Sequence, residues 1–513
     1  GKSIAAKVFI DCTYEGDLMA KAGVSYIIGR EDNKQYGETY NGVQLMKGHQ
    51  FPDGVDPYKI KGDSTSGLLW GISPAALSSD GTGDKLVQAY NYRICLTDNP
   101  ANKIEITRPE NYDSTKYELL LRLFDAQPNK RKLNHYFIWS RMPNNKTDIN
   151  NRGGFSTDMI GMNHNYPEAS YEERAEIIKA HKDYTQGLLY FYKTDPRVPQ
   201  ELRDEIQAWG YPKDEYTEDN HWSPQLYIRE SRRMTGDYVM TQAHCEGRET
   251  VTDGIGMAAY TMDSHNCQRL LVKKDGKYIV KNEGNVEIGG GLPYPISYRS
   301  IIPKEEECKN LLVPVCLSAS HIAYGSIRME PVFMVLAQSA AIAAAEAINT
   351  GSVQTVDIKK VQALLHENPL LDDSFSEILI DDSELDLSIN NDWEVIKKQG
   401  GYGPTFLKSK VRNGSPVRFS PHMEHEGKYK VYTYYHMRKD ISPAITYSIS
   451  NGIDSWTRVI HKDSVRIEGQ TTGEWIELGT YNFQKSSMPY IEISTGDTSG
   501  AVIADAVLFI PVK

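Results

Sequence analysis

The chain has 513 residues, a length that at roughly 150 residues per domain predicts two to four domains. Its 68 acidic and 57 basic side chains give a net charge of −11, which argues against a nucleic-acid-binding protein. The longest weakly polar run, residues 332–348, is interrupted by Gln338, Ser339 and Glu346, so we expect no membrane span. Six cysteines without a C-x-x-C pair support neither a disulfide framework nor a zinc ribbon. The 32 tyrosines favour a secreted or carbohydrate-handling protein.

The N-terminal region has an α/β pattern. Residues 7–11 read as a strand, residues 12–17 as a tight turn, and residues 17–22 as a short helix that ends at Gly23. The strand begins abruptly with no signal peptide before it, so we expect that a longer protein was cut at this point. A second apolar run, residues 311–317, is expected to lie in the same sheet, about 300 residues later in the chain.

Three helices are predicted after this region. Ser170 and Glu173 form a capping box that begins one helix, and Pro199 opens another that ends at Gly210. The third, residues 331–349, is dense in alanine and serine. Small side chains allow close approach, so this helix either packs tightly on a sheet or lies near a flat cofactor.

From residue 377 the apolar pattern changes to period two, which predicts a β-sandwich or barrel that folds alone. We expect strands at residues 377–381, 417–419, 428–435, 444–450, 475–478, 490–494 and 506–510. The apolar phase slips at Gly479, which indicates a bulge. In residues 428–435, Tyr429 and Val431 share one face with Thr433 and Tyr435. The tyrosines of the opposite, wetter face either stack on sugar rings or cover the join to the rest of the chain.

Several short motifs are weak. The G-x-G-x-x-A at residues 254–259 follows no apolar strand, so we do not interpret it as a dinucleotide fingerprint, and the glycine run at residues 289–291 is expected to be a loop. His422 with His425, residues 263–267, and Asp381 with Asp382 each contain metal-ligand types, the last pair suiting calcium. None has companions at convincing spacing, and the sequence assigns no metal site.

The strongest constellation is residues 325–331, GSIRMEP. A serine and Arg328 stand directly before a helix whose N-terminal amides carry partial positive charge. That arrangement favours a phosphate, or the negative charge that grows on a flavin ring during reduction.

These residues carry a resemblance to a known family. Residues 8–18 (VFIDCTYEGDL), 316–321 (CLSASH), 325–331, 229–233 (RESRR) and 236–238 (GDY) resemble the FAD-dependent oxidoreductase family, which groups many bacterial flavoproteins of unassigned substrate, some labelled xanthan lyase. Residues 377–513 resemble the golvesin and xanthan-lyase C-terminal carbohydrate-binding-like domain, through features such as IDD at 380–382, GYG at 401–403 and ADAV at 504–507.

The resemblance implies roles for particular residues. Arg328 would stabilise reduced flavin or a substrate anion, and His321 and Tyr324 would face the ring as general base or packing groups. The implied cofactor-binding residues are Asp11, Thr13, Gly16, Asp17, Gly325, Ser326 and Glu330. For all of these except Arg328, a purely structural role is an equal alternative. The family's N-terminal G-x-G-x-x-G unit is not in this chain, so FAD is implied for the full-length protein and is not expected to be held tightly here.

The predicted fold class is a mixed α/β (α+β) flavoprotein-like body with an inserted substrate domain, followed by an all-β sandwich. We expect a remnant of the FAD-binding domain at 1–30, a substrate domain at 31–300, a return to the FAD-binding domain at 301–371 and the sandwich at 372–513. The predicted function is that of the C-terminal portion of an FAD-dependent oxidoreductase acting on a small-molecule or saccharide-like substrate. The alternative is a carbohydrate-binding or polysaccharide lyase protein without a redox role, for which residues 163–166 (NHNY) supply suitable side chains. A periplasmic or secreted location is expected if a signal peptide preceded residue 1.

Overall fold

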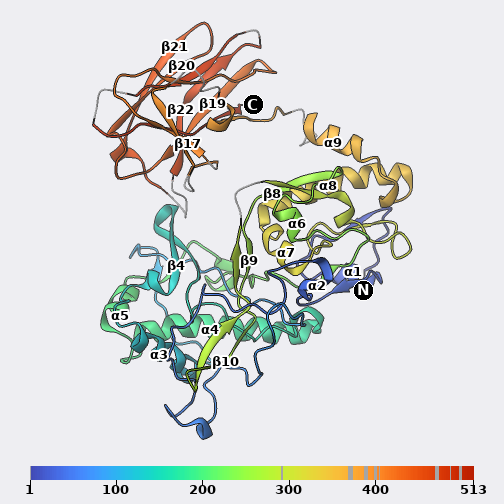
Figure 1. Cartoon of the computed structure of the whole chain (residues 1–513), viewed down its shortest axis with the longest axis vertical. Helices are drawn as coiled ribbons and strands as arrows, with labels where there is room; N and C mark the ends of the chain where they lie inside the picture. The colour runs from blue at the N-terminus through green and yellow to red at the C-terminus, as the bar shows by residue number, and fades with distance from the viewer. Residues whose placement is uncertain are drawn as a thin grey trace. The chain divides into compact units, whose positions relative to one another are not determined.

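The computed structural model describes residues 2–289, 293–367, 374–385, 391–397, 401–403, 405–467, 473–485, 487–495 and 499–512. It divides into two compact units, Gly1–Ala363 and Leu364–Lys513, which we call the body and the sandwich (Figure 1). The mixed α/β body and the mostly β second unit confirm the predicted fold class. Two members of the glycine run expected as a loop, residues 290 and 291, lie outside the described residues.

The body combines helices with short paired strands. Its helices are α1 (Asp17–Lys21), α2 (Asn33–Tyr36), α3 (Glu118–Ala126), α4 (Tyr171–Thr194), α5 (Gln200–Gln207), α6 (Gln242–Cys245), α7 (His321–Ile327), α8 (Glu330–Thr350) and α9 (Ile358–Glu367), the last of which leads into the second unit. Its strands are β1 (Phe9–Ile10), β2 (Tyr26–Ile27), β3 (Lys103–Ile104), β4 (Phe137–Met142), β5 (Lys146–Asn151), β6 (Tyr211–Pro212), β7 (Arg233–Met234), β8 (Gly254–Ala258), β9 (Met262–Ser264), β10 (Gln268–Lys274), β11 (Lys277–Glu283), β12 (Val286–Ile288), β13 (Tyr294–Ser297) and β14 (Leu311–Leu312).

The first strand and a strand some 300 residues later lie side by side, as the sequence predicts. β1 pairs with β14 in parallel, with Phe9 opposite Leu311. Met19 of α1 packs with Leu311 and Cys316 in a buried cluster beneath this pair. Burial of these apolar side chains therefore joins the start of the chain to the segment that leads into α7 and α8.

Helix α8 packs on β8 through small residues. Gly256 of β8 leaves room for the helix, since an added Cβ would lie 3.0 Å from Val335. Ser339 of α8 donates a hydrogen bond to the Ile255 carbonyl at 2.5 Å. This contact fits the tight-packing interpretation of the small residues on that face.

Among the described helices, α8 alone has the length and apolar composition of a membrane span, which is weak evidence because core helices of soluble proteins share both properties.

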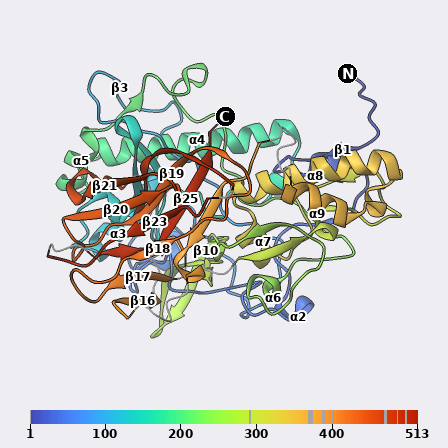
Figure 2. The same cartoon turned by 90° about the horizontal axis from the view of Figure 1, so that it is seen from above.

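The middle of the body has an aromatic core around α4, the long helix that crosses the body in Figure 2. The predicted capping box is confirmed: the Ser170 amide donates to the Glu173 carboxylate at 2.8 Å, and the Glu173 amide donates to the Ser170 hydroxyl at 3.2 Å. Many of the chain's tyrosines are buried in this core, including Tyr90, Tyr92, Tyr117, Tyr136, Tyr184 and Tyr192. Much of the tyrosine excess therefore serves packing rather than a wet surface.

The second unit is built from three antiparallel sheets with the strand orders β15-β25-β19-β22, β16-β17-β24 and β18-β23-β20-β21. Its strands are β15 (Ile378–Asp381), β16 (Trp393–Lys397), β17 (Thr405–Ser409), β18 (Val417–Phe419), β19 (Gly427–His436), β20 (Ala444–Ser450), β21 (Ser455–His461), β22 (Gly473–Phe483), β23 (Tyr490–Ile493), β24 (Ile503–Ala504) and β25 (Ala506–Pro511). A separate hydrophobic core, including Phe406, Val431 and Phe509, fills its interior.

Two local predictions about this unit are confirmed. The pairing of β19 with β22 shifts register between Val431, opposite Gly479, and Tyr432, opposite Glu477, which is the expected bulge. Tyr429, Val431, Thr433 and Tyr435 are all buried on one face of β19, while Lys428 and Lys430 of the other face are exposed. Tyr434 of that wetter face is nevertheless buried, with its ring 5.4 Å from Trp475.

Candidate active site

Most of the predicted site residues lie in two places, the turn after β1 and the junction of α7 with α8. In the turn, the buried Asp11 carboxylate accepts hydrogen bonds from the Thr13 amide at 3.0 Å, the Thr13 hydroxyl at 2.6 Å and the Met19 amide at 3.0 Å. Gly16 has a φ of 66°, and an added Cβ would lie 2.9 Å from the Met19 side chain. Asp11, Thr13 and Gly16 thus build the turn itself.

Asp17 is held by two arginines. Arg174 of α4 donates two hydrogen bonds to its carboxylate, at 2.6 and 2.9 Å, and Arg232 donates a third at 2.7 Å. The hydrogen bonds from Arg174, followed by those from Arg232, lower the pKa of Asp17 to about 2 against the opposing effect of burial. Both oxygens of this carboxylate therefore tie the turn to the middle of the body.

Arg328 follows α7 and is buried, with 3% of its surface exposed. It donates to the Asp263 carboxylate at 2.9 Å and to the Asp263 carbonyl at 3.2 Å. Burial disfavours its charge, but the nearby Asp263 carboxylate raises the pKa of Arg328 above its usual value. Asp263 of β9 thus holds the positively charged guanidinium of Arg328 in one position.

His321 stands at the start of α7 within a buried chain of polar groups. One of its ring nitrogens lies 2.8 Å from the Glu230 carboxylate and the other lies 2.9 Å from the Ser264 hydroxyl. Burial alone would raise the pKa of Glu230, but His321, Arg233 and a hydrogen bond from Gln88 lower it to about 2. All members of this chain are buried, so His321 connects α7 to β9, directly beside Asp263.

The next residues of α7 also contact the segment around β9. An added Cβ on Gly325 would lie 2.8 Å from the Asp263 carbonyl oxygen, so this position needs a glycine. Ser326 donates to the Tyr260 carbonyl at 2.6 Å and accepts from the Tyr294 hydroxyl at 2.7 Å. Gly325 and Ser326 therefore fix the distance between α7 and the segment that carries Asp263.

Aromatic side chains gather around Arg328 and Glu330. Tyr324 is buried, and its ring lies 6.2 Å from Phe333, which in turn lies 6.0 Å from Tyr14. Burial, followed by Glu330 and then Tyr227, raises the pKa of Tyr14 to about 12. Phe333 belongs to the first turn of α8, so its contact with Tyr14 brings that turn, with the half-buried Glu330, near the turn after β1.

Side chains from the middle of the body complete this group. The guanidinium of Arg93 lies 5.7 Å from the Tyr227 ring, and that of Arg229 lies 5.2 Å from the same ring. Burial, followed by the Asp263 carboxylate, raises the pKa of Tyr260 against the opposing effect of Arg328. We call the following residues the tyrosine–arginine cluster: Tyr14, Arg93, Tyr227, Tyr260, Arg328 and Glu330. Sequence reasoning missed four of these as site residues: Tyr14, Arg93, Tyr227 and Tyr260. Tyr14 stands in the motif of residues 8–18 but was given no role there, and the other three come from separate segments with no shared spacing.

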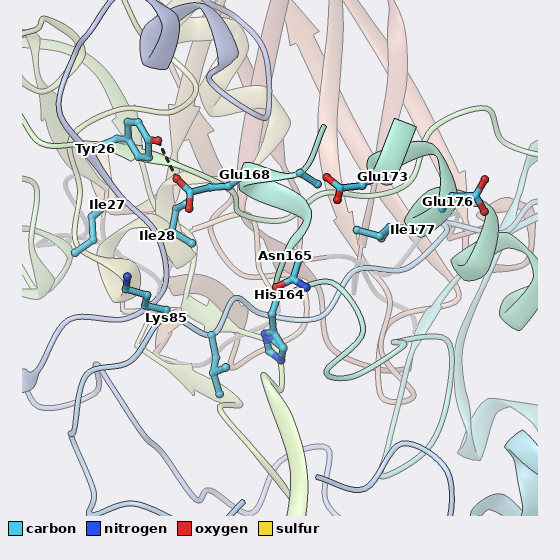
Figure 3. Close-up of a pocket in the computed structure, with 12 residues that line it drawn as sticks. Tyr26, Ile27, Ile28, Lys85, His164, Asn165, Glu168, Glu173, Glu176 and Ile177 are labelled. Carbon is cyan, nitrogen blue, oxygen red and sulfur yellow. Dashed lines mark hydrogen bonds between the residues drawn. The ribbon is translucent and has the colours of Figure 1, made fainter. Parts of the chain in front are cut away.

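A pocket of about 900 Å³ lies elsewhere in the body (Figure 3). Its lining includes His164 and Asn165, which belong to the NHNY segment that suits a lyase, and also Lys85. Three carboxylates, from Glu168, Glu173 and Glu176, line it as well, and Tyr26 donates to Glu168 at 2.9 Å. None of the predicted catalytic or cofactor-binding residues lines this pocket.

The family described as FAD dependent oxidoreductase matches residues 1–365, which include the tyrosine–arginine cluster and every predicted site residue. The chain belongs to this family. The predicted relationship is confirmed, and membership implies FAD as the family's cofactor. The Golvesin C-terminal domain matches residues 378–511 of the sandwich.

No curated protein matches the chain. Among solved structures, a Paenibacillus xanthan lyase is 22% identical with a TM-score of 0.23, and the match covers 27% of this chain and 13% of that one. A ruminal GH26 endo-beta-1,4-mannanase is 12% identical with a TM-score of 0.20, covering 27% of each chain. The CBM22-1 xylan-binding domain from Paenibacillus barcinonensis is 11% identical with a TM-score of 0.17, covering 26% of this chain and 87% of that one.

Proposed function

We propose that the body handles flavin and substrate in an FAD-dependent oxidoreductase, and that the tyrosine–arginine cluster receives the flavin ring. The observation that carries this proposal is the buried Arg328 guanidinium at the α7–α8 junction, which Asp263 holds at 2.9 Å. The charge of Arg328 also interacts with Tyr227 and Tyr260 from the middle of the body. A flavin ring is flat and aromatic and gains negative charge on reduction. Tyrosine faces beside a fixed guanidinium match both properties.

The side chains of the tyrosine–arginine cluster are more available to the flavin ring than the carboxylates of the turn after β1 are to the nucleotide of FAD. Tyr260 is 47% exposed and Tyr14 is half-buried, so both keep surface for a ligand. By contrast, the carboxylates of Asp11 and Asp17 are engaged by the hydrogen bonds described above. We assign Asp11, Thr13, Gly16 and Asp17 the role of shaping the turn that presents Tyr14.

Within the cluster each side chain has a distinct task. Arg328 stabilises negative charge, Asp263 orients its guanidinium, and the tyrosines offer stacking surface. His321 and Ser264 act as positioning residues, because they hold α7 against β9 beside Asp263. FAD, when bound, would supply the capacity to accept a hydride or electrons from the substrate. We propose that this substrate is a small molecule or a saccharide-like compound.

We also propose that these 513 residues hold FAD only weakly. The sequence contains no G-x-G-x-x-G, and its G-x-G-x-x-A forms β8 rather than the turn before a helix. A helix N-terminus such as that of α8 contributes only about 1 kcal/mol to anion binding. We therefore expect a dissociation constant in the micromolar range or weaker.

An FAD titration followed by flavin fluorescence tests both proposals. We expect quenching that saturates above micromolar FAD, and about fivefold weaker binding for Tyr227→Leu, because loss of one aromatic contact costs about 1 kcal/mol. Tyr278→Leu, on the exposed side of β11, is the matched control and should bind as the unaltered chain does. Submicromolar affinity would overturn the claim of weak binding. Equal affinity of the two variants would overturn the assignment of the ring to the cluster.

The lyase alternative is less well supported. His164 and Asn165 line the pocket of Figure 3, but the three glutamates there would repel an acidic polysaccharide. A lyase acting on such a polymer would need the opposite balance of charge. An increase in unsaturated-sugar absorbance when the protein acts on an acidic polysaccharide would restore this alternative.

A further inference from the structure

Three aspartates meet at one end of a sheet of the sandwich. Asp381 is the last residue of β15 and Asp382 follows it, while Asp505 directly precedes β25. Asp381 pairs with Ala506 across the two antiparallel strands, which brings Asp505 to the same place. One oxygen from each of the three carboxylates lies within 4.8 Å of the others.

Two of these carboxylates have oxygens without partners. Asp505 is fully buried; its Oδ2 accepts a hydrogen bond from the Tyr402 amide at 3.0 Å, but its Oδ1 has no partner among the described residues. Oδ1 of Asp381 likewise has no partner within the described part of the chain. Asp382, 2% exposed, accepts from the Thr405 hydroxyl at 3.0 and 3.2 Å. No described Lys, Arg or His forms an ion pair with any of the three.

Burying these three neighbouring carboxylates costs free energy of folding unless a positive charge compensates them. Burying a carboxylate without a partner removes its hydration, and neighbouring carboxylates repel one another. A cation bound among the three oxygens would offset both the lost hydration and the repulsion.

The loop that faces the aspartates approaches them very closely. An added Cβ on Gly401 would lie 2.7 Å from Oδ2 of Asp505, and one on Gly403 would lie 2.9 Å from Oδ1 of Asp381. The Thr405 carbonyl oxygen lies 3.0 Å from the same Cβ position of Gly401, so a neutral oxygen is also near. Carboxylate and carbonyl oxygens on an irregular loop are the donors that calcium accepts in a flexible geometry.

We propose that Asp381, Asp382 and Asp505 bind a calcium ion that fixes the 401–403 loop of the sandwich. This loop carries Tyr402, which is 46% exposed and whose ring lies 5.3 Å from Trp475 and 6.0 Å from Tyr434. The ion therefore holds Tyr402 in an aromatic group at the surface of the unit. Magnesium suits the site less well, because it requires near-ideal octahedral geometry and gives up its water reluctantly.

Metal analysis after equilibrium dialysis of the full chain against calcium tests the proposal. We expect one calcium ion per chain, none for Asp505→Asn or Asp381→Asn, and one for the control Asp463→Asn, an exposed aspartate of the same unit. In melting experiments, calcium at a hundredfold excess over its dissociation constant should raise the transition of the sandwich by about 5–10 °C. In EDTA, Asp505→Asn should melt at or above the temperature of the unaltered chain, because the variant removes an uncompensated buried charge.

Several results would overturn the proposal. The first is a chain that retains no calcium at millimolar concentration and melts identically in calcium and EDTA. The second is undiminished calcium binding by Asp381→Asn, whose half-exposed side chain makes this variant the more tolerant one if Asp505→Asn fails to fold. An equal stabilisation by magnesium at the same concentration would overturn the assignment to calcium.

Discussion

The charge balance between Arg328 and Asp263 should set the reduction potential of the bound flavin. If the guanidinium stabilises the reduced ring, Arg328→Ala removes a charged contact worth about 1.5–3 kcal/mol. For a two-electron couple about 1.4 kcal/mol corresponds to 30 mV, so the potential should become about 30–60 mV more negative. The same loss should slow flavin reduction, by up to about a hundredfold where the contact is strongest in the transition state.

Asp263→Asn should shift the potential in the opposite direction. Its carboxylate lies 2.9 Å from the guanidinium and offsets part of that positive charge. The amide keeps a hydrogen-bonding oxygen but removes the negative charge, so we expect a potential about 30 mV more positive. The potential of Arg328→Lys should fall between those of Arg328→Ala and Asp263→Asn, because lysine keeps the positive charge but lacks the planar guanidinium.

The assay is a spectroscopic redox titration of the protein saturated with FAD. Arg299→Ala is the control, because Arg299 forms an ion pair of similar length with Asp253, although its side chain is half-exposed, and it lies outside the tyrosine–arginine cluster. Circular dichroism should show that each variant is folded, since Arg328→Ala removes the nearer of the two cationic partners of the mostly buried Asp263 carboxylate and leaves only His265, at 3.9 Å, among the described residues. Shifts of the same sign for Arg328→Ala and Asp263→Asn, or shifts no larger than that of the control, would refute the reasoning.

Two further predictions concern stability. Burial lowers the pKa of His181 to about 4, below the usual value near 6.5, so the unfolded chain binds this proton more readily. The body should therefore lose up to about 3 kcal/mol of stability as pH falls from about 6.5 to 4, and His181→Phe should flatten this slope in urea unfolding; an unchanged slope would contradict the assignment. The fragment 376–513 should show a cooperative melt and β-type circular dichroism, because the sandwich has its own core; a soluble but unfolded fragment would show that it depends on the body.

Local patterns in the sequence were enough to predict much of the fold. The capping box at Ser170 was predictable because both of its partners lie within one helical turn. The bulge at Gly479 followed from the slip in apolar alternation within a single strand. β16, β17, β21 and β24 were missed, because they are short or carry charged side chains that weaken the alternation.

The candidate site was only partly predictable for a different reason. Arg328 stands in a compact motif before a helix and was found from the chemistry of the helix N-terminus. Its partner Asp263 lies 65 residues away in sequence, and Tyr227 and Arg93 are further still, so only the folded chain brings them together. The motif therefore identified one member of the cluster and not the contacts that determine what that member does.

The two units differ in how their buried charges are paired. In the body, the fully buried Arg233 meets Glu31 at 2.7 Å and Glu230 at 2.8 Å, so a charge that leaves water gains opposite partners. In the sandwich, Asp382 and Asp505 are buried to a similar degree, yet no described cationic side chain reaches them. The body thus pairs its buried charge with its own side chains, whereas the oxygens of Asp382 and Asp505 are available to a cation from solution. This contrast supports the proposal that calcium binds in the sandwich.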